Sequence, residues 1–183
     1  GFRYSKAGFF ELDVGGLQGF GVEAEDGSRV VFAREAAIME SSDGGASFTE
    51  RSSSPGLEVF GFAPKDPSIV IGSAYADLEG AISLSEDMGL TWRRVLLPEL
   101  GTGVLLDFAF SPVDPNVIWV LERRTADQNN ILFHSDDGGE TFSIVYVEHE
   151  LPPYALNNGT LAPSPKDPGR VAIVGRHGVD STI

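Results

Sequence analysis

An eight-residue pattern, S-x-D-x-G-x-[ST]-[FW], occurs three times in this chain of 183 residues, at positions 41–48, 85–92 and 135–142. The copies read SSDGGASF, SEDMGLTW and SDDGGETF, and their aspartates are 44 and 50 residues apart. A second pattern, P-x-D-P, alternates with the first, at positions 64–67, 112–115 and 165–168, and its aspartates are 48 and 53 residues apart. Two unrelated patterns that keep nearly the same period indicate tandem repeats.

Each repeat is predicted to contain four short β-strands. An apolar run comes first, and P-x-D-P then forms a turn, because Pro fixes φ and Asp can bond nearby backbone amides. A run rich in β-branched residues follows, and a third strand leads into the S-x-D-x-G pattern, whose aromatic residue opens a fourth. The expected strands are 58–62, 69–71, 81–84 and 91–97, then 105–110, 117–120, 131–134 and 141–147. Four antiparallel strands per repeat, without helical periodicity, predict an all-β fold, a β-propeller of four-stranded blades.

The two ends of the chain continue the same register. Residues 2–10 are expected to supply a third and a fourth strand, and residues 154–161 and 170–175 a first and a second strand. The chain then holds sixteen strands, about four blades' worth. The expected division is the end of one blade at 1–16, full blades at 17–53, 54–98 and 99–150, and the start of a further blade at 151–183.

Two ring arrangements fit this count. The ends of the chain could pair and close a small four-bladed ring, or the chain could be part of a ring of about six to eight blades. We favour the larger ring, because nothing in the terminal residues shows that they complete one blade, and an open arc would expose apolar faces and sheet edges. Because the sequence begins at Gly1 without Met, we expect a processed product or an excised segment.

Charge and composition disfavour several classes of function. The formal net charge of −14 argues against nucleic acid and anionic membranes as partners. The chain has no Cys, which removes disulfides and thiolate metal sites, and no apolar run reaches the length of a membrane span. His134, His149 and His177 lack the spacing of metal ligands, and no glycine-rich loop lies between a strand and a helix. We therefore expect no metal, no cofactor and no membrane insertion.

The two patterns together resemble the Asp-box, or BNR, repeat. Such repeats occur in the propellers of sialidases, family-74 glycoside hydrolases (xyloglucanases) and sortilin-type receptors. The resemblance covers nearly the whole chain and implies a propeller, but the repeat occurs in enzymes and non-enzymes alike. With the absence of Cys, it implies an extracellular or periplasmic bacterial location.

The Asp-box positions are expected to be structural. The Ser and Asp side chains can bond the amides of their own turn, the glycines can adopt positive φ, and the aromatic residues can pack inward. A calcium loop is disfavoured, because SDDGGETF lacks ligands at alternating positions followed by a distant acidic residue. The structural positions are Ser41, Asp43, Gly45, Phe48, Ser85, Asp87, Gly89, Trp92, Ser135, Asp137, Gly139 and Phe142.

The topology of a blade predicts where a ligand binds. Turns between strands one and two and between strands three and four share one side of the propeller, so both patterns lie there. The remaining loops lie on the other side, where the resembling families carry their function. The residues expected to form a ligand rim are Tyr75, Asp77, Glu79, Arg123, Arg124, Asp127, Tyr154 and Asn157.

Two kinds of catalytic site are alternatives to a binding site. A sialidase needs an arginine cluster, and Arg34, Arg123 and Arg176 fall near the ends of second strands, but the Arg-Ile-Pro segment of those enzymes is absent. A xyloglucanase needs two carboxylates. Asp13, in the stretch DVGG, resembles the surroundings of a catalytic Asp in that family, and Asp107 could be its partner or could instead bond a backbone amide.

The sequence therefore favours a non-catalytic, extracytoplasmic propeller module. Its partner is expected to be a glycan or a protein, bound on the side opposite the Asp-boxes, and it could also pair with the rest of its own propeller. The alternative is part of a glycoside hydrolase of the xyloglucanase or sialidase kind.

Overall fold

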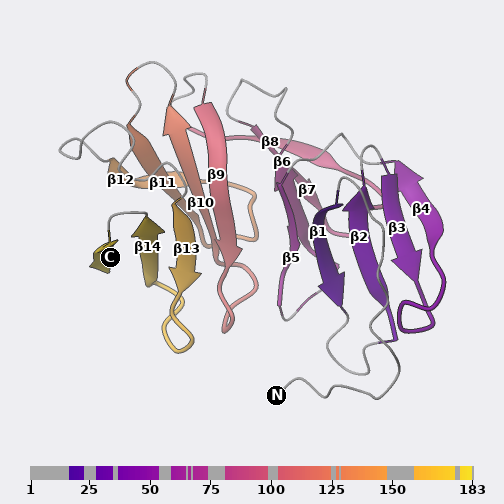
Figure 1. Ribbon diagram of the computed structural model, residues 1–183. Coiled ribbons are helices and arrows are strands. Elements are labelled where there is room, and N and C mark those ends of the chain that lie inside the picture. Colours follow the sequence, from indigo (N-terminus) through magenta and orange to yellow (C-terminus); the bar gives the residue numbers. More distant parts are fainter. Residues whose placement is uncertain are drawn as a thin grey trace.

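The computed structural model of the chain is built of strands and turns (Figure 1). The structure describes residues 17–22, 28–34, 37–53, 59–64, 66, 68–73, 81–98, 103–124, 127, 129–147, 159–175 and 178–182. Within these ranges there is no helix, and hence none long and apolar enough to cross a membrane. The expected all-β fold is confirmed.

The described strands form four antiparallel sheets, each in the order of the sequence. Sheet 1 consists of β1 (Leu17–Val22), β2 (Val30–Arg34), β3 (Ala37–Ser41) and β4 (Thr49–Ser53). Sheet 2 consists of β5 (Val59–Phe62), β6 (Val70–Ser73), β7 (Ala81–Ser85) and β8 (Arg93–Leu96). Sheet 3 consists of β9 (Gly103–Phe110), β10 (Ile118–Arg124), β11 (Asn130–Ser135) and β12 (Ser143–Val147). Sheet 4 consists of β13 (Thr160–Pro163), β14 (Val171–Gly175) and β15 (Gly178–Thr182).

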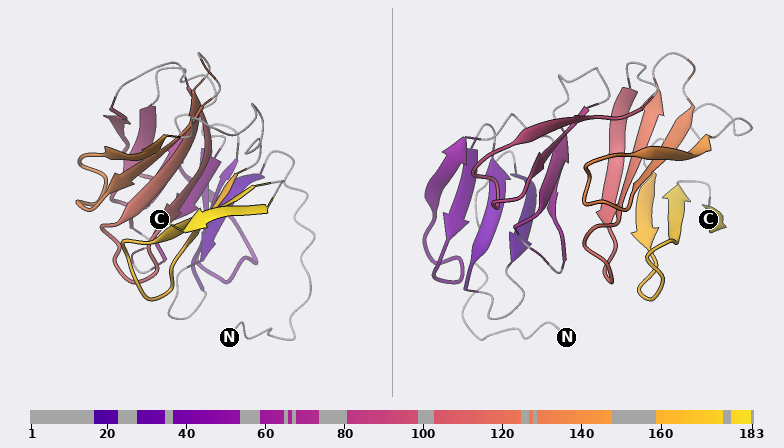
Figure 2. Two further views of the ribbon diagram at one scale, coloured as in Figure 1. Left: turned by 90° about the vertical axis from the view of Figure 1, so that its left-hand side faces the viewer. Right: turned by 180° about the vertical axis from the view of Figure 1, so that it is seen from behind.

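The sheets stand side by side, each facing the next, as the two further views show (Figure 2). The first strand of each sheet lies against the first strand of the next, so that β1 contacts β5, β5 contacts β9 and β9 contacts β13. The last strands, β4, β8 and β12, lie at the opposite edge of their sheets. This is the arrangement of consecutive propeller blades around an inner row of strands.

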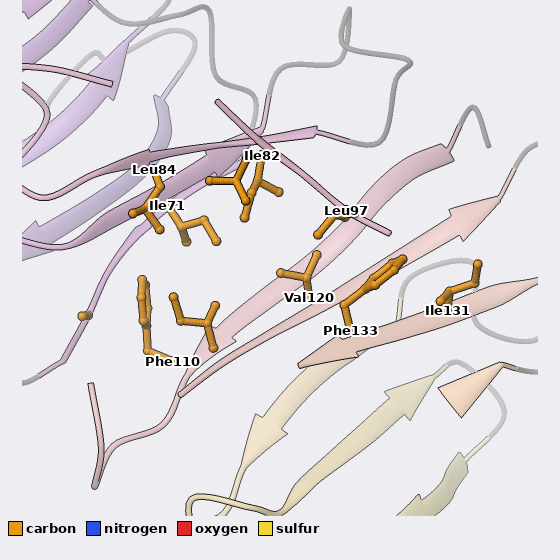
Figure 3. Close-up of a cluster of buried hydrophobic side chains, with 11 residues drawn as sticks. Ile71, Ile82, Leu84, Leu97, Phe110, Val120, Ile131 and Phe133 are labelled. Atoms are coloured by element: carbon orange, nitrogen blue, oxygen red, sulfur yellow. The ribbon is translucent and has the colours of Figure 1, made fainter. Parts of the chain in front are cut away.

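Apolar side chains fill the spaces between neighbouring sheets. In β10 the side chains alternate: Ile118 and Val120 belong to the cluster shared with sheet 2 (Figure 3), and Trp119 and Leu121 to the cluster shared with sheet 4. All four side chains are at most 3% exposed. Burying one such side chain contributes about 1.5–3 kcal/mol, so both faces of sheet 3 add to stability.

Two features of the secondary structure differ from the sequence-based expectation. The strand β10 continues to Arg124, so residues 122–124, expected in a loop, extend the sheet by pairing with β9 and β11. A third strand, β15, follows β14, whereas only two strands were expected there. Its sequence, GVDST, has a single large apolar residue and so gives little β signal. The expected strands at 2–10 lie outside the described residues, and the division into blades stays a prediction.

In each of the first three sheets a backbone hydrogen bond joins the turn between the first and second strands to the turn between the third and fourth strands. We call residues 41–48, 85–92 and 135–142 the Ser-Asp turns. The amide of Met88 donates to the carbonyl of Ser68 (2.8 Å), and the amide of Gly138 donates to that of Asn116 (2.9 Å). Gly44 and Ser28 form the same bond at 2.7 Å. Both kinds of turn therefore lie on one side of the molecule, the turn side; the other is the loop side.

Glycines at the Ser-Asp turns adopt backbone conformations that favour glycine. Gly138 and Gly139 have φ values of 73° and 85°. A Cβ atom on Gly139 would lie 2.9 Å from Cδ1 of the fully buried Leu84 in sheet 2, whereas a Cβ on Gly138 would meet only Oδ1 of Asn116, at 3.6 Å. Gly139 is thus needed for two reasons, its positive φ and the close approach of two sheets.

We expect Gly139→Ala to destabilise the protein more than Gly138→Ala. Both substitutions lower the free energy of unfolding by about 1–2 kcal/mol, because alanine disfavours the left-handed backbone conformation. Only Gly139→Ala also displaces Leu84, which adds about 1–3 kcal/mol. Urea unfolding monitored by tryptophan fluorescence measures both costs. Equal losses would show that the approach of the turn to sheet 2 is not limiting.

Candidate functional site

The third Ser-Asp turn shows how the acidic pattern is used. The hydroxyl of Ser135 donates to Oδ1 of Asp137 (2.8 Å) and accepts from the amide of Gly139 (2.8 Å). Asp137 in turn accepts from the amide of Thr141 (2.9 Å) and from its hydroxyl (2.6 Å). Both oxygens of the Asp137 carboxylate therefore accept hydrogen bonds from donors within the turn itself.

The other two Ser-Asp turns repeat this network. Asp87 accepts from the hydroxyl of Ser85 (2.8 Å) and from the amide of Thr91 (2.8 Å). Asp43 accepts from Ser41 (2.7 Å) and from the amide of Ser47 (2.9 Å). Three copies with one bonding scheme indicate that these aspartates hold turns.

These hydrogen bonds favour the ionised form of the carboxylates. The pKa of Asp137 is lowered to about 2, chiefly by the hydroxyl of Thr141 and then by the Thr141 amide. At Asp87, burial raises the pKa, but hydrogen bonds from Thr91 and Ser85 outweigh it and lower the pKa to about 2. Carboxylates held in this way are poor candidates for proton transfer near neutral pH.

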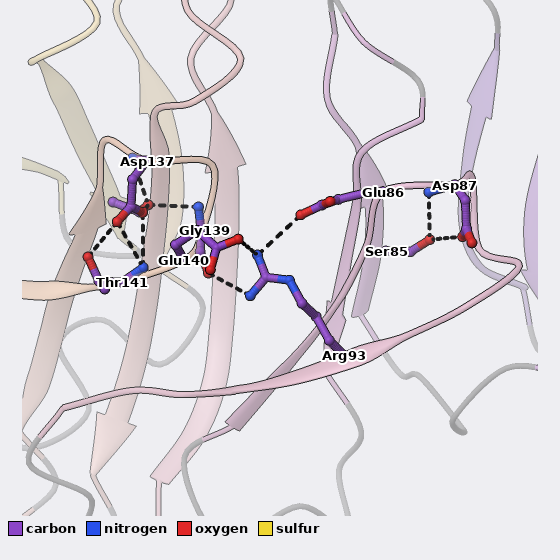
Figure 4. A network of polar contacts seen from close by, with 9 residues as sticks. Ser85, Glu86, Asp87, Arg93, Asp137, Gly139, Glu140 and Thr141 are labelled. Carbon is purple, nitrogen blue, oxygen red and sulfur yellow. Dashed lines mark hydrogen bonds and ion pairs between the residues drawn. The ribbon is translucent and has the colours of Figure 1, made fainter.

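The Ser-Asp turns also bind the neighbouring sheet. Arg93, on β8, donates to the carbonyl of Gly139 (3.3 Å) and lies 3.4 Å from carboxylate oxygens of both Glu86 and Glu140 (Figure 4). A small pocket on the turn side is lined by Leu84, Glu86, Thr91, Trp92 and Arg93. Its cation, Arg93, already has two acidic partners, so the pocket leaves no unpaired cation for an anionic ligand.

Sheets 1 and 2 are joined in a similar way. Arg51, on β4, forms an ion pair with Glu40 (2.5 Å) and donates to the carbonyl of Asp87 (3.4 Å). Ser52 donates to the carbonyl of Gly89. The polar groups described on the turn side therefore mainly hold turns and join sheets, and Nε of Arg51 and Nε of Arg93 are left without a hydrogen-bond partner among the described residues.

The loop side is described mainly at the end of sheet 3. Arg123, Arg124 and Asp127 of the expected rim lie there, whereas its other members are outside the described residues, namely Tyr75, Asp77, Glu79, Tyr154 and Asn157. Asp13, Arg176, His149 and His177 are outside them too. Arg34 ends β2, and nothing is described of its side chain.

Arg124 and Asp127 bind each other. Nε of Arg124 donates to Oδ1 of Asp127 at 2.9 Å, and Nη2 donates to Oδ2. Asp127 also accepts from the amide of Asn129 (3.1 Å) and from its side-chain amide (2.9 Å). The hydrogen bond from Arg124 is the main reason that the pKa of Asp127 is lowered to about 2. These two members of the expected rim therefore close the turn from β10 to β11.

Glu122 is the unusual group on the loop side. It is 5% exposed, lies near the end of β10, and pairs across the strands with the buried Ile131. No hydrogen bond or ion pair reaches its carboxyl from the described residues. Burial raises its pKa to about 7, against a smaller opposing effect of Arg124. The sequence analysis missed Glu122, although an acidic residue that continues an apolar alternation after Ile118 and Val120 was a usable signal.

Asp107 bonds backbone amides, the second of the two roles considered for it. Oδ1 accepts from the amide of Phe108 (2.9 Å), and Oδ2 accepts from the amide of Leu161 in sheet 4 (2.7 Å). Burial raises its pKa, and these amides oppose the shift. Asp107 pairs with Leu121 and faces sheet 4, whereas Glu122 faces sheet 2. The two carboxyls therefore lie on opposite faces of sheet 3 and do not form a catalytic pair.

Metal-ligating side chains do not gather in the described part of the chain. No group of three or more His, Cys, Asp or Glu residues is placed there to hold an ion. His134 stacks on Trp119 with ring centroids 4.3 Å apart, which is the contact of a packed aromatic pair.

We expect Asp137→Ala to lower the free energy of unfolding by about 1–2 kcal/mol near neutral pH, because three donors of the turn lose their acceptor. The pKa of Asp137 is lower in the folded chain, so this contribution is present above about pH 4 and is lost as the pH falls through about 2. Urea unfolding at pH 7 and at pH 2.5 tests it. The adjacent, exposed Asp136→Ala is the control and should change stability by less than about 0.5 kcal/mol.

For Glu122→Gln we expect the opposite dependence on pH. The folded pKa of about 7 exceeds the ordinary value of 4.5, so the protonated carboxyl is favoured in the folded chain and stability is lost as the pH rises between these values. Glutamine stays neutral at every pH. The free energy of unfolding of the variant should therefore rise by about 2–3 kcal/mol relative to that of the wild type as the pH increases from 4.5 to 8. Urea unfolding at both pH values measures the difference. A difference that does not change with pH would contradict the assignment.

Comparisons with known proteins bear on the fold. No protein-family model and no curated protein matches the chain. Among solved structures it is similar to an ancestral GH74 enzyme, at 12% identity and a TM-score of 0.55, over 91% of this chain and 25% of that one. It is also similar to apo AztD from Citrobacter koseri, at 16% identity and a TM-score of 0.54, over 92% of this chain and 46% of that one. Both are β-propellers. The chain therefore has a propeller fold and spans about a quarter to a half of the length of these structures.

Proposed function

We propose that this chain is a non-catalytic propeller module that binds a glycan or a protein partner on its loop side. The observation that carries the proposal is the contrast between the two sides. On the turn side the aspartates of all three Ser-Asp turns are engaged within their own turns. On the loop side Glu122 is buried, has a raised pKa and has no hydrogen-bonding partner among the described residues. A titratable group whose pKa is strongly shifted by burial is more often found at a ligand-binding site than in a part of the molecule that only holds the fold.

The Ser-Asp turns are proposed to be Asp-boxes. Their sequence pattern, their shared bonding scheme and their position between the third and fourth strands of a sheet support this assignment. On the same basis we propose an extracellular or periplasmic location for the module.

The rest of a propeller is proposed to complete the ring. The similar structures are about two to four times longer than the part that this chain covers. Further blades would bury the outer faces of sheets 1 and 4 in the way that sheets 2 and 3 bury theirs.

A glycoside hydrolase is the second candidate. The raised pKa of Glu122 is what a general acid requires, and the ancestral GH74 enzyme shares the fold. Retaining and inverting glycosidases both need two carboxyls that face one substrate. Glu122 and Asp107 are the described carboxyls whose pKa is raised, and they face opposite sides of sheet 3. Binding is therefore the better supported role.

A glycan array combined with a hydrolysis screen tests the proposal. We expect glycan binding without turnover, weakened at least about tenfold by Tyr75→Ala or Arg123→Ala on the loop side. The turn-side variants Glu86→Ala and Glu140→Ala, which change exposed residues, should bind within about twofold of the wild type.

Two results would contradict the binding module. Robust turnover that is lost in Asp13→Ala or Asp107→Ala would establish a hydrolase. Copurification with a stoichiometric protein, without sugar binding and without effect of the loop-side variants, would favour an assembly scaffold.

A further inference from the structure

We infer that Glu122 and Gly103 form a subsite on the loop side that binds a hydroxyl group of a neutral glycan. The inference rests on the proposed function, since it identifies the ligand class of that side of the molecule.

Gly103 leaves the space that the Glu122 carboxyl occupies. A Cβ atom on Gly103, at the start of β9, would lie 1.4 Å from Oε1 of Glu122 and 2.2 Å from its Cδ. No other residue could stand at position 103 without moving the carboxyl. Gly103 therefore leaves the room in which the structure places the carboxyl.

The carboxyl lacks the partners that a buried structural acid normally has. The acids that hold structure elsewhere in this chain each accept several hydrogen bonds, as Asp107 does from Phe108 and Leu161. Around Glu122 the described residues donate none, although the side chain is 5% exposed. The hydrogen-bonding sites of this carboxyl are therefore not taken up by the described residues, and a ligand at this place could bond them.

The neighbours of Glu122 determine the class of ligand. Its cross-strand neighbours are Ile131 on β11 and Leu105 on β9, both apolar. Among the described residues the cation that acts on it is Arg124, which forms two hydrogen bonds with the carboxylate of Asp127. Such surroundings keep the carboxyl uncharged up to near neutral pH, because burial outweighs the effect of Arg124.

An uncharged carboxyl has one donor and one acceptor site to offer. A sugar hydroxyl also has both and can satisfy the two sites together. An ammonium group would need the ionised carboxylate, which the apolar neighbours disfavour, and a carboxylate or sulfate would find Arg124 already paired. The fit is therefore to a neutral polyhydroxylated ligand.

A matched set of variants tests the subsite on an array of neutral oligosaccharides built of glucose, xylose, mannose and galactose, with sialylated glycans and chitosan oligomers as charged probes. Glu122→Leu keeps the size of the side chain and removes both hydrogen-bonding sites, so binding to the best neutral probe should fall about ten- to hundredfold. Glu122→Gln supplies a donor and an acceptor without charge and should restore affinity to within about threefold. Gly103→Ala displaces the carboxyl and should reproduce the loss of Glu122→Leu.

Several outcomes would overturn the subsite. They are equal binding by the wild type and Glu122→Leu, loss of binding in Glu122→Gln as large as in Glu122→Leu, or a preference for the charged probes. Urea unfolding of each variant separates lost binding from lost folding. If Arg123→Ala or Tyr75→Ala weakens glycan binding and Glu122→Leu does not, the binding module stands and the subsite fails. If the wild type binds no probe and no protein, both fail.

Discussion

The structure depends on sheets that bury both of their faces. In sheet 3 the side chains of β10 point alternately toward sheet 2 and toward sheet 4, and those on each side are buried. A strand with two apolar faces is stable only between two neighbours, because no face can be left in water. This requirement stacks the sheets one after another and makes the first strands form an inner row.

The Ser-Asp turns make this stacking possible at the edge of each pair of sheets. Gly139 lets the third turn approach Leu84 of sheet 2, and Arg93 of sheet 2 reaches the carbonyl of the same glycine. The aspartate and serine satisfy the polar groups of the turn locally, so that the turn can be placed against a neighbouring sheet without leaving buried amides unpaired. The turn thus serves the fold twice, once within its sheet and once between sheets.

The same arrangement separates structural from functional chemistry. Since the turns that carry most of the patterned acids share one side, the acids there are held in hydrogen bonds that lower the pKa of Asp87 and Asp137 to about 2. At the far end of β10, Arg124 and Asp127 form comparable bonds, and no hydrogen bond from the described residues reaches the carboxyl of Glu122 beside them. This contrast supports the proposal that a ligand binds on the loop side.

Much of the fold could be predicted from the sequence, because its strands and turns depend on residues that lie close together in the chain. The repeated patterns, the apolar runs and the glycines predicted an all-β propeller with positive φ at Gly139, and the structure shows both. Less of the loop-side end of sheet 3 could be predicted from the sequence. The strand β15 is short and polar, and the extension of β10 to Arg124 depends on pairing with β9 and β11, which no local pattern records.

The sequence alone therefore determined the repeat, the kind of strand and the kind of turn, since these follow from backbone preferences and from residues close together in the chain. Only the tertiary structure decided which carboxyls are paired. Asp107 meets the amide of Leu161, 54 residues further along the chain, and Glu122 meets the bare backbone of Gly103 on another strand. Burial and hydrogen bonding depend on these distant neighbours, and they in turn set the pKa that makes one acid structural and another a candidate for binding.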